Sequence, residues 1–325
     1  MKLKFRVFAD LPSDRNSPIE LIEHVAKLAE NYGYEGVLIF FGRNTLDPVL
    51  LSSIVLRHTS NLIPLLAAQP YYASPVQMAR IIESIFLLHN RKINLNMITG
   101  ADPGELNEMH NTLDHGDRYK RVVEYVQVLK AMLMSEKKIA FQGDYYSFAA
   151  LTPHPVPPEY MPKICMAGSS PASIEAASQV ADVAISHPEP IGQFAQSPIL
   201  RLRGKADIGM RIGILARETR EEAWRAAHAK YKLDHKSLVV ARMKLRSESS
   251  WNKSLAQLAL QAETHDDVYW LGGFLGGDAA PILVGDYASV SGYLRKYAEL
   301  GVNTLLLDSY AEEDFYHTDK IIEPL

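Results

Sequence analysis

The chain has 325 residues, of which 47% are hydrophobic and 22% are charged, as in an ordinary globular protein. Its 34 basic and 38 acidic residues give a formal net charge of −4, which argues against the clustered basic surface of a nucleic-acid-binding protein. The single cysteine, Cys165, allows no intrachain disulfide, and no apolar stretch approaches the ~20 residues of a membrane-spanning helix. We therefore expect a cytoplasmic protein that acts on neither nucleic acids nor membranes.

Strand-like and helix-like segments alternate along the whole chain. Helices are expected at 18–32, 75–89, 117–134 and 219–232, because each of these amphipathic segments opens with Pro, Asp or Thr. Short strands rich in β-branched and other apolar residues are expected at 3–9, 36–41, 62–68, 92–98, 163–167, 180–186, 207–216 and 302–308.

This alternation, without a change in composition, predicts one α/β domain over residues 1–325, folded as a (β/α)8 barrel. The alternative is an open doubly wound sheet, which more often carries a glycine-rich turn after its first strand. Here Leu11-Pro12-Ser13-Asp14 follows the first strand instead. The barrel is therefore the favoured interpretation.

A long insertion, about 217–301, lies between the seventh and eighth strands. It is too long for one βα unit, and it is charged in its first part and glycine-rich at 272–277. A long insertion near the catalytic end of a barrel is most often a lid or an oligomer contact, and both interpretations stay open. We expect few contacts to hold residues 247–285, so that they move when no ligand is bound.

Two polar sites follow strands, where barrel enzymes place their chemistry. Asn96 is an amide in the otherwise apolar fourth strand, and it either faces a ligand or satisfies backbone groups inside the barrel. Gly168, Ser169 and Ser170 follow the fifth strand and open a helix, which favours an anion such as phosphate. A plain helix cap at Ser170 explains the same residues.

Other familiar chemistries find little support in the residues. The eleven histidines show no metal-ligand spacing, so no metal site is expected. Cys165 lies inside a predicted buried strand, where a thiol is usually inert, and the chain has no P-loop. Residue patterns alone thus indicate a barrel enzyme, and at the turn after the fifth strand they are compatible both with a phosphate-bearing cofactor and with a plain helix cap.

The polar segments belong to a longer series of motifs that runs in one order over roughly residues 5–320. The motifs lie at 96–106, 113–119, 141–146, 168–170, 186–190, 209–212, 216–224, 283–286 and 297–301. In this order they resemble the FMNH2-dependent alkanesulfonate monooxygenases of the bacterial luciferase-like family.

The resemblance implies a reduced FMN cofactor whose phosphate and ring system are held by one set of residues. That cofactor-binding set is Asn96, His115, Tyr119, Gly168, Ser169 and Ser170. It also implies two-component chemistry, in which a separate NAD(P)H flavin reductase supplies reduced FMN and O2 oxygenates a small-molecule substrate. The insertion would correspond to the family's mobile lid, and we expect a homodimer or homotetramer.

The substrate half of the site departs from the family pattern. Arg211 keeps the arginine after the seventh strand, whereas Gly213 and Leu275 stand where the sulfonate enzymes have a histidine and a lid arginine. Thr45 and His187 replace the family's active-site cysteine and tryptophan, and the late tyrosine is kept. The residues expected to carry the reaction are thus Arg211, Tyr310, His187 and Thr45.

These departures predict a flavin-dependent monooxygenase whose substrate is not a simple alkanesulfonate. Three alternatives stay open. The first is a true alkanesulfonate monooxygenase that uses Arg211, Arg43 and Lys253. The others are a deazaflavin-dependent oxidoreductase and a flavin-binding protein without turnover.

Overall fold

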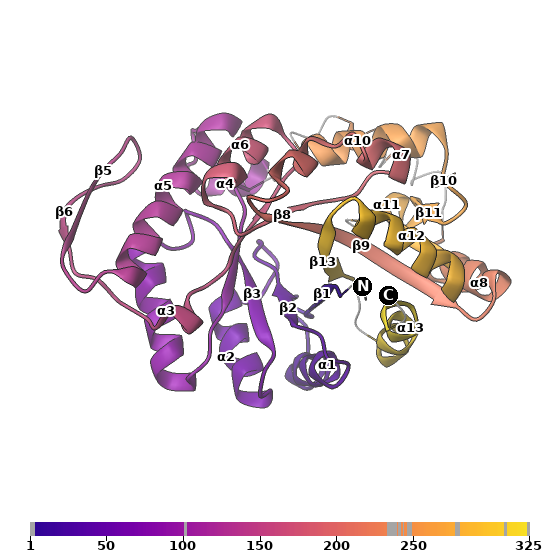
Figure 1. Cartoon of the computed structure of the whole chain (residues 1–325), viewed down its shortest axis with the longest axis horizontal. Coiled ribbons are helices and arrows are strands. Elements are labelled where there is room, and N and C mark those ends of the chain that lie inside the picture. Colours follow the sequence, from indigo (N-terminus) through magenta and orange to yellow (C-terminus); the bar gives the residue numbers. More distant parts are fainter. Residues whose placement is uncertain are drawn as a thin grey trace.

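A computed structural model describes residues 4–100, 103–232, 249–276, 280–308 and 311–323, together with residues 239, 242, 244 and 245. Eight parallel strands form a closed barrel in which each strand pairs with the next and β9 pairs with β13 (Figure 1). In barrel order these are β13 (Val302–Leu307), β1 (Arg6–Asp10), β2 (Gly36–Ile39), β3 (Ile63–Ala68), β4 (Asn94–Met97), β7 (Ile164–Ala167), β8 (Val183–Ser186) and β9 (Asp207–Arg217). The predicted (β/α)8 barrel is confirmed.

Helices cover the outside of the barrel, and the four predicted ones are present. Those four are α1 (Ile19–Asn31), α3 (Pro75–His89), α5 (His115–Met134) and α8 (Arg220–Lys230). The layer also contains α2 (Pro48–His58), α4 (Pro103–Glu108), α6 (Pro171–Val180), α7 (Ile191–Phe194), α12 (Tyr287–Glu299) and α13 (Glu312–Ile322). Short 3-10 turns lie at Pro158–Tyr160 and Pro198–Leu202. No helix in the described residues is long and apolar enough to cross a membrane.

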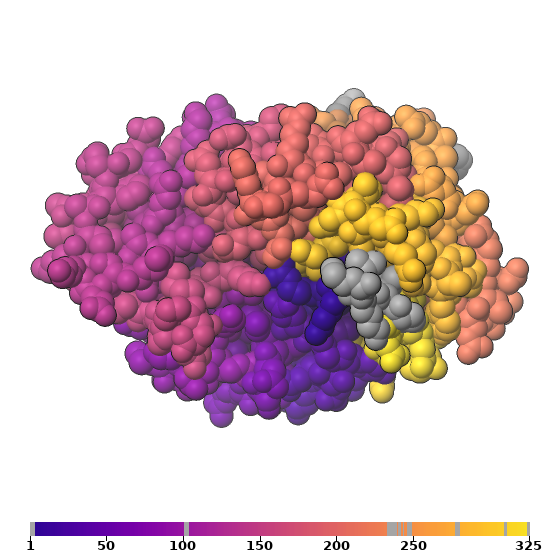
Figure 2. Space-filling model, viewed as in Figure 1, coloured from indigo at the N-terminus to yellow at the C-terminus, as the bar shows by residue number. Residues whose placement is uncertain are grey.

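The two ends of the chain meet on the barrel wall. β13 and β1 are neighbouring strands, and the space-filling view shows the yellow C-terminal segments against the indigo N-terminal ones (Figure 2). A two-stranded hairpin of β5 (Ile139–Gln142) and β6 (Ser147–Leu151) projects beyond α5 at the opposite side of the molecule (Figure 1). The Glu124 carboxylate of α5 holds the turn of this hairpin, because it accepts hydrogen bonds from three backbone N–H groups of the turn at 2.8 to 3.0 Å.

The barrel interior has a polar pair at each end and an apolar middle. At the amino ends of the strands, Arg6 donates to Asp207 at 2.7 Å, and at the carboxyl ends Arg211 pairs with Asp10. Between them lies a cluster of buried apolar side chains: Phe8, Leu38, Leu65, Cys165, Val183, Ile185 and Leu306. Burial raises the pKa of Cys165 to about 12, so this thiol is not a nucleophile at neutral pH.

The insertion extends the barrel wall. β12 (Ile282–Asp286) pairs in parallel with the outer half of β9, from Gly213 to Arg217. Antiparallel β11 (Tyr269–Trp270) and β10 (Thr264–His265) continue this sheet, and α10 (Ser250–Gln261) and α11 (Gly272–Leu275) complete the segment (Figure 1). β9 therefore joins two sheets, because its first half belongs to the barrel and its second half to the insertion.

The expectation that few contacts hold residues 247–285 is wrong for most of the segment. Tyr269, Trp270, Leu271 and Phe274 are each 0% exposed. Gly272 is not a hinge, because an added Cβ would lie 1.9 Å from the Trp270 ring, so the glycine permits close packing. Residues 247, 248 and 277–279 lie outside the described residues.

Candidate active site

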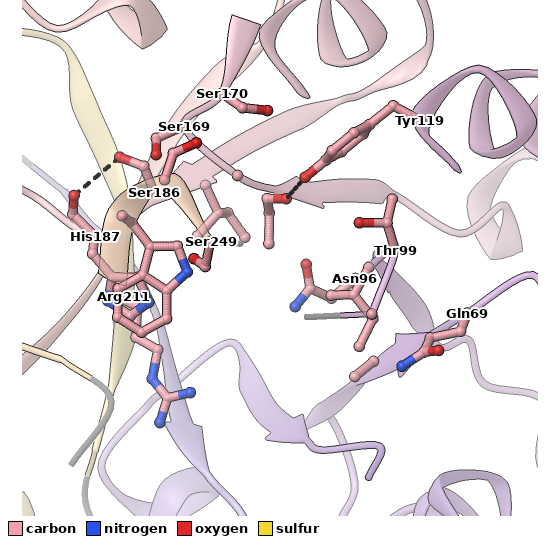
Figure 3. Close-up of a pocket in the computed structure, with 18 of the residues that line it drawn as sticks. Gln69, Asn96, Thr99, Tyr119, Ser169, Ser170, Ser186, His187, Arg211 and Ser249 are labelled. Atoms are coloured by element: carbon pink, nitrogen blue, oxygen red, sulfur yellow. Dashed lines mark hydrogen bonds between the residues drawn. The ribbon is translucent and has the colours of Figure 1, made fainter. Parts of the chain in front are cut away.

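A cavity of about 380 Å³ opens at the carboxyl ends of β2, β3, β4, β7, β8, β9 and β13, the end at which barrel enzymes carry out their chemistry. Figure 3 shows the polar side chains that surround it. Its lining includes most of the residues predicted from the sequence: Asn96, His115, Tyr119, Gly168, Ser169, Ser170, His187 and Arg211. Residues spread over more than a hundred positions thus meet around one cavity.

The turn between β7 and α6 forms one end of this cavity. Gly168 has a φ of +151°, and an added Cβ would lie 2.6 Å from Tyr119 Oη, so only glycine fits there. Ser170 is the N-cap of α6, and its Oγ accepts the Ser173 N–H at 3.2 Å. The capping interpretation is therefore correct, and it leaves room for a ligand because Ser169 also lines the cavity.

α5 supplies an imidazole and a cation to the same end. His115 Nε2 lies 3.0 Å from Ser170 Oγ, and the Arg118 guanidinium lies 3.5 Å from His115 Nδ1. Arg118 is 5% exposed and donates to the Leu113 carbonyl at 3.1 Å. A buried cation, hydroxyls and a helix N-terminus together favour a phosphate group.

Arg118 was not predicted as a site residue, although a signal for it was present. It lies three positions after His115, which places both side chains on one face of α5. Tyr119, the next residue, is buried and donates its hydroxyl to the Ala167 carbonyl at 3.2 Å. Burial raises the pKa of Tyr119, so its hydroxyl stays protonated.

Asn96 lies in the middle of the cavity wall, where β4 ends. Its side chain is 7% exposed, and its Oδ1 has no hydrogen-bond partner among the described residues. A buried amide oxygen without a donor is costly. This favours the ligand interpretation of Asn96 over the one in which it satisfies the barrel backbone, and Gln69 and Thr99 stand nearby in the lining.

The other end of the cavity carries Arg211 and His187. Arg211 pairs with the Asp10 carboxylate, which is 1% exposed, and its guanidinium lies 4.6 Å from the centre of the Phe40 ring. His187 stacks on Trp251, with ring centres 3.9 Å apart. Burial, and then the charge of Arg211, lowers the pKa of His187 to about 3. Neither Asp10 nor Trp251 was predicted from the sequence.

The loop after β8 that carries His187 is held by tyrosines that lie in or beside the insertion. Tyr269 donates to the Pro188 carbonyl at 2.9 Å, and Tyr297 donates to the Glu189 carbonyl at 2.6 Å. Both tyrosines are 0% exposed. The insertion therefore fixes the position of His187 and also brings Ser249, Ser250 and Trp251 to the cavity.

Thr45, one of the predicted catalytic residues, is not brought to the cavity. Thr45 does not line it, because its hydroxyl donates to the Gly42 carbonyl at 2.9 Å and accepts the Gly42 N–H at 3.0 Å, which closes the loop after β2. A role for Thr45 in the reaction is therefore not supported. Tyr310 lies outside the described residues. Gly213 and Leu275 are also absent from the lining.

Comparison with known proteins identifies the family. A family model described as luciferase-like monooxygenase matches residues 1–304. The chain belongs to the luciferase-like monooxygenase family. A family relative from Niallia circulans, BtrO, is 44% identical over 304 residues, which cover 92% of this chain and 89% of BtrO. BtrO is named as a monooxygenase of a 4-(gamma-L-glutamylamino)butanoyl group on an acyl-carrier protein. The protein is thus a monooxygenase, but a specific closeness to the alkanesulfonate enzymes is not confirmed.

Solved structures share the fold of this luciferase-like chain. Riboflavin lyase RcaE, solved with modified FMN and riboflavin, has a TM-score of 0.75 at 14% identity and covers 100% of this chain and 91% of its own. An F420-dependent secondary alcohol dehydrogenase has a TM-score of 0.71 at 14% identity, covering 100% and 98%. Proteins of this fold therefore include users of flavin and of F420.

The residues of this luciferase-like site fit a flavin monophosphate. Gly168 keeps the backbone open where a side chain would block the approach to α6. Ser169, Ser170, His115 and Arg118 supply donors and positive charge for a phosphate. The amide oxygen of Asn96 lacks a donor, which the N–H groups of a flavin ring can provide.

Proposed function

We propose that the protein is a two-component flavin-dependent monooxygenase that receives reduced FMN from a separate NAD(P)H flavin reductase. The cluster of Ser169, Ser170, His115 and Arg118 at the N-terminus of α6 carries this proposal. Reduced FMN, when bound, would supply the two electrons that let one atom of O2 enter a small organic substrate and the other leave as water.

The residues of the chain divide between two tasks. Ser169, Ser170 and His115 would hold the phosphate, with Arg118 supplying buried positive charge beside them. Asn96 would accept a hydrogen bond from the flavin ring. His187 and Arg211 would face the substrate at the opposite end, and the apolar side chains of the lining would exclude water from the reaction.

The relationship with BtrO supports an acyl substrate. BtrO is named for an acyl group on a carrier protein and is 44% identical to this chain. The substrate end of the cavity agrees with such a group, because it combines the apolar side chains of Leu38, Phe40 and Leu306 with a neutral His187. We therefore propose an acyl chain, and not a simple alkanesulfonate, as the substrate.

Two measurements test the proposed chemistry. Anaerobic fluorescence titration should show that reduced FMN binds more tightly than oxidised FMN and than FAD, since the phosphate end suits a single phosphate. Mass spectrometry with isotopically labelled O2, reduced FMN and candidate acyl substrates should find one labelled oxygen atom in the product. Tight capture of oxidised FMN with no labelled product would indicate a flavin-binding protein without turnover. Reduction of a substrate by reduced F420 would indicate a deazaflavin-dependent oxidoreductase.

An alkanesulfonate monooxygenase is the second candidate, because Arg211 is retained in the cavity. A buried sulfonate needs paired positive charge, and the Arg211 charge is already paired with Asp10. With a flavin reductase present, linear sulfonates should release no more sulfite than a control without enzyme. Robust sulfite release would establish the second candidate instead.

A further inference from the structure

We propose that Asp10 sets the substrate class: by neutralising Arg211, it makes this end of the cavity accept an uncharged polar group, such as a carbonyl or an amide, and reject a sulfonate or carboxylate. The inference rests on the proposed function in one respect, since it takes the Arg211 end as the substrate end. Asp10 acts through Arg211 and is therefore a positioning residue.

The ion pair spans the top of the barrel. Arg211 in β9 has Leu306 in β13 as its register partner, and Leu306 in turn pairs with Phe8 in β1. Asp10 follows Phe8 by two residues on β1, so its side chain points to the same side of the strand. The two charged groups meet across β13, with side chains only 1% and 16% exposed. This is a buried pair, and not a surface contact.

Few other charged side chains line the end of the cavity that contains Arg211. The charged side chains in the described lining are Glu105, Arg118 and Arg211, and Arg118 lies with His115 at the phosphate end. In Figure 3 the Arg211 guanidinium points away from Ser169 and Ser170. Arg211 therefore belongs to the substrate end and Arg118 to the cofactor end.

Two further groups near Arg211 bring no free positive charge to the cavity. Lys244 influences His187, but it is not in the lining, and its ammonium group donates to the Phe274 carbonyl at 2.9 Å and lies 3.6 Å from the Phe274 ring centre. His187 is neutral at physiological pH, since its pKa is lowered to about 3. An anion at this end would thus meet an arginine whose charge Asp10 already balances.

The same pair leaves donors for an uncharged ligand. Arg211 Nε is buried and has no hydrogen-bond partner among the described residues, and the same holds for His187 Nδ1. A guanidinium has five N–H donors, so a bond to Asp10 does not exhaust it. A carbonyl oxygen can accept one of these donors without bringing a net charge into the site, whereas a buried anion without a free countercharge is costly.

An isosteric pair of ligands tests the proposal on the flavin-free protein. Hexanesulfonamide and hexanesulfonate have nearly the same shape, but only the sulfonate is an anion at neutral pH. By isothermal titration calorimetry, the wild-type protein should bind the sulfonamide at least about tenfold more tightly. Asp10→Asn keeps the shape of the side chain and frees the Arg211 charge, so this preference should fall at least tenfold or reverse. Asp14→Asn, an exposed aspartate nearby, is the matched control and should keep it.

A second variant covers the case in which Asp10→Asn folds poorly, because removing one half of a buried pair is destabilising. The double variant Asp10→Asn/Arg211→Gln removes both charges and should keep the wild-type preference for the sulfonamide. A wild-type protein that binds the sulfonate as tightly as the sulfonamide would overturn the proposal. So would a folded Asp10→Asn variant with an unchanged preference. Loss of FMN binding in a separate titration would refute the proposed function alone, since neither ligand carries a phosphate.

Discussion

His187 shows how burial decides the chemistry of a single residue. In the sequence it is a histidine at a position where the sulfonate enzymes have a tryptophan. In the structure it stacks on Trp251, beside the charged Arg211, and both burial and that charge lower its pKa. A neutral imidazole can donate one hydrogen bond and accept another, but it cannot hold an anion by charge.

The low pKa of His187 predicts a pH-dependent stability. In the unfolded chain the ring protonates below its ordinary pKa of 6.5, whereas in the folded protein it protonates only at about 3. The unfolded state therefore binds more protons between these values. Between pH 6.5 and about 3, His187 should lower the free energy of unfolding by about 1.4 kcal/mol for each pH unit of acidification. Above pH 6.5 it should have no effect on the free energy of unfolding.

Urea unfolding of the wild type and of His187→Asn measures this contribution. The variant should show a shallower loss of stability on acidification, by about 1.4 kcal/mol per pH unit at a pH of about 5. Identical slopes for wild type and His187→Asn would contradict the buried, neutral ring.

Separate substitutions of Ser169 and Ser170 can distinguish ligand binding from helix capping. Ser170 is the N-cap of α6, whereas no hydrogen bond of the Ser169 side chain is seen in the described part of the chain. Ser169→Ala should weaken FMN binding about tenfold, since a hydrogen bond to a charged group contributes ~1.5–3 kcal/mol, and leave the melting temperature unchanged. Ser170→Ala should weaken FMN binding and also lose ~1 kcal/mol of stability.

Fluorescence titration and thermal unfolding of both variants check this prediction. Ser178→Ala is the control, because the side chain of this partly exposed serine of α6 bonds to the Glu175 carbonyl at 2.7 Å and does not line the cavity. If Ser169→Ala kept full FMN affinity and a normal melting temperature, the turn between β7 and α6 would have a purely structural role.

At the scale of elements, the insertion packs as part of the protein core and supports the catalytic end of the barrel. β12 pairs with the outer half of β9, and Trp270 donates its indole N–H to Glu263 at 2.7 Å. The loop that carries His187 packs against this unit. The described parts of the segment, which are α10, β10, β11, α11 and β12, therefore form a wall that presents Trp251 to the cavity.

The tyrosines that hold the His187 loop give a test of this wall. Tyr269→Phe or Tyr297→Phe removes the donor of a buried backbone carbonyl, which should cost about 1–3 kcal/mol in each case. Tyr316→Phe, at a tyrosine that is 46% exposed, should cost little. Chemical denaturation compares the three variants. Equal stability in all of them would show that the hydroxyls do not secure the loop.

At the scale of the whole molecule, the barrel could be predicted because its strands are buried on both faces. Such strands are nearly continuous apolar runs, and the helices between them carry start signals such as Pro75 and Thr219. Asn96, Gly168, Ser169 and Ser170 could be placed at the rim of the cavity for a related reason, because they lie in or just after strands, and parallel strands place their carboxyl ends at one rim. His115 and Tyr119 lie in α5, and they were expected in the site only through the family resemblance.

Other parts of the site depend on contacts that no local pattern contains. Asp10 and Arg211 are 201 residues apart in the chain, and they meet only because the barrel closes with a particular register. Thr45 lies away from the cavity for a similar reason, because a matching position in the chain does not say which group the hydroxyl will bond. The glycine-rich run that begins at Gly272 suggested a mobile segment. In the structure, a glycine stands at position 272 because an added Cβ would overlap the Trp270 ring.

The phosphate end should stabilise the whole molecule when FMN binds. A ligand at about one hundred times its Kd adds ~2.7 kcal/mol to the free energy of unfolding, which raises the melting temperature of a protein of this size by about 3–6 °C. Riboflavin has the same ring system but no phosphate, so it cannot use Ser169, Ser170, His115 and the charge of Arg118. At equal concentration it should shift the melting temperature much less than FMN, as differential scanning fluorimetry would show. Equal shifts from FMN and riboflavin would mean that the ring alone is bound, and that the end of the cavity at α6 does not recognise phosphate.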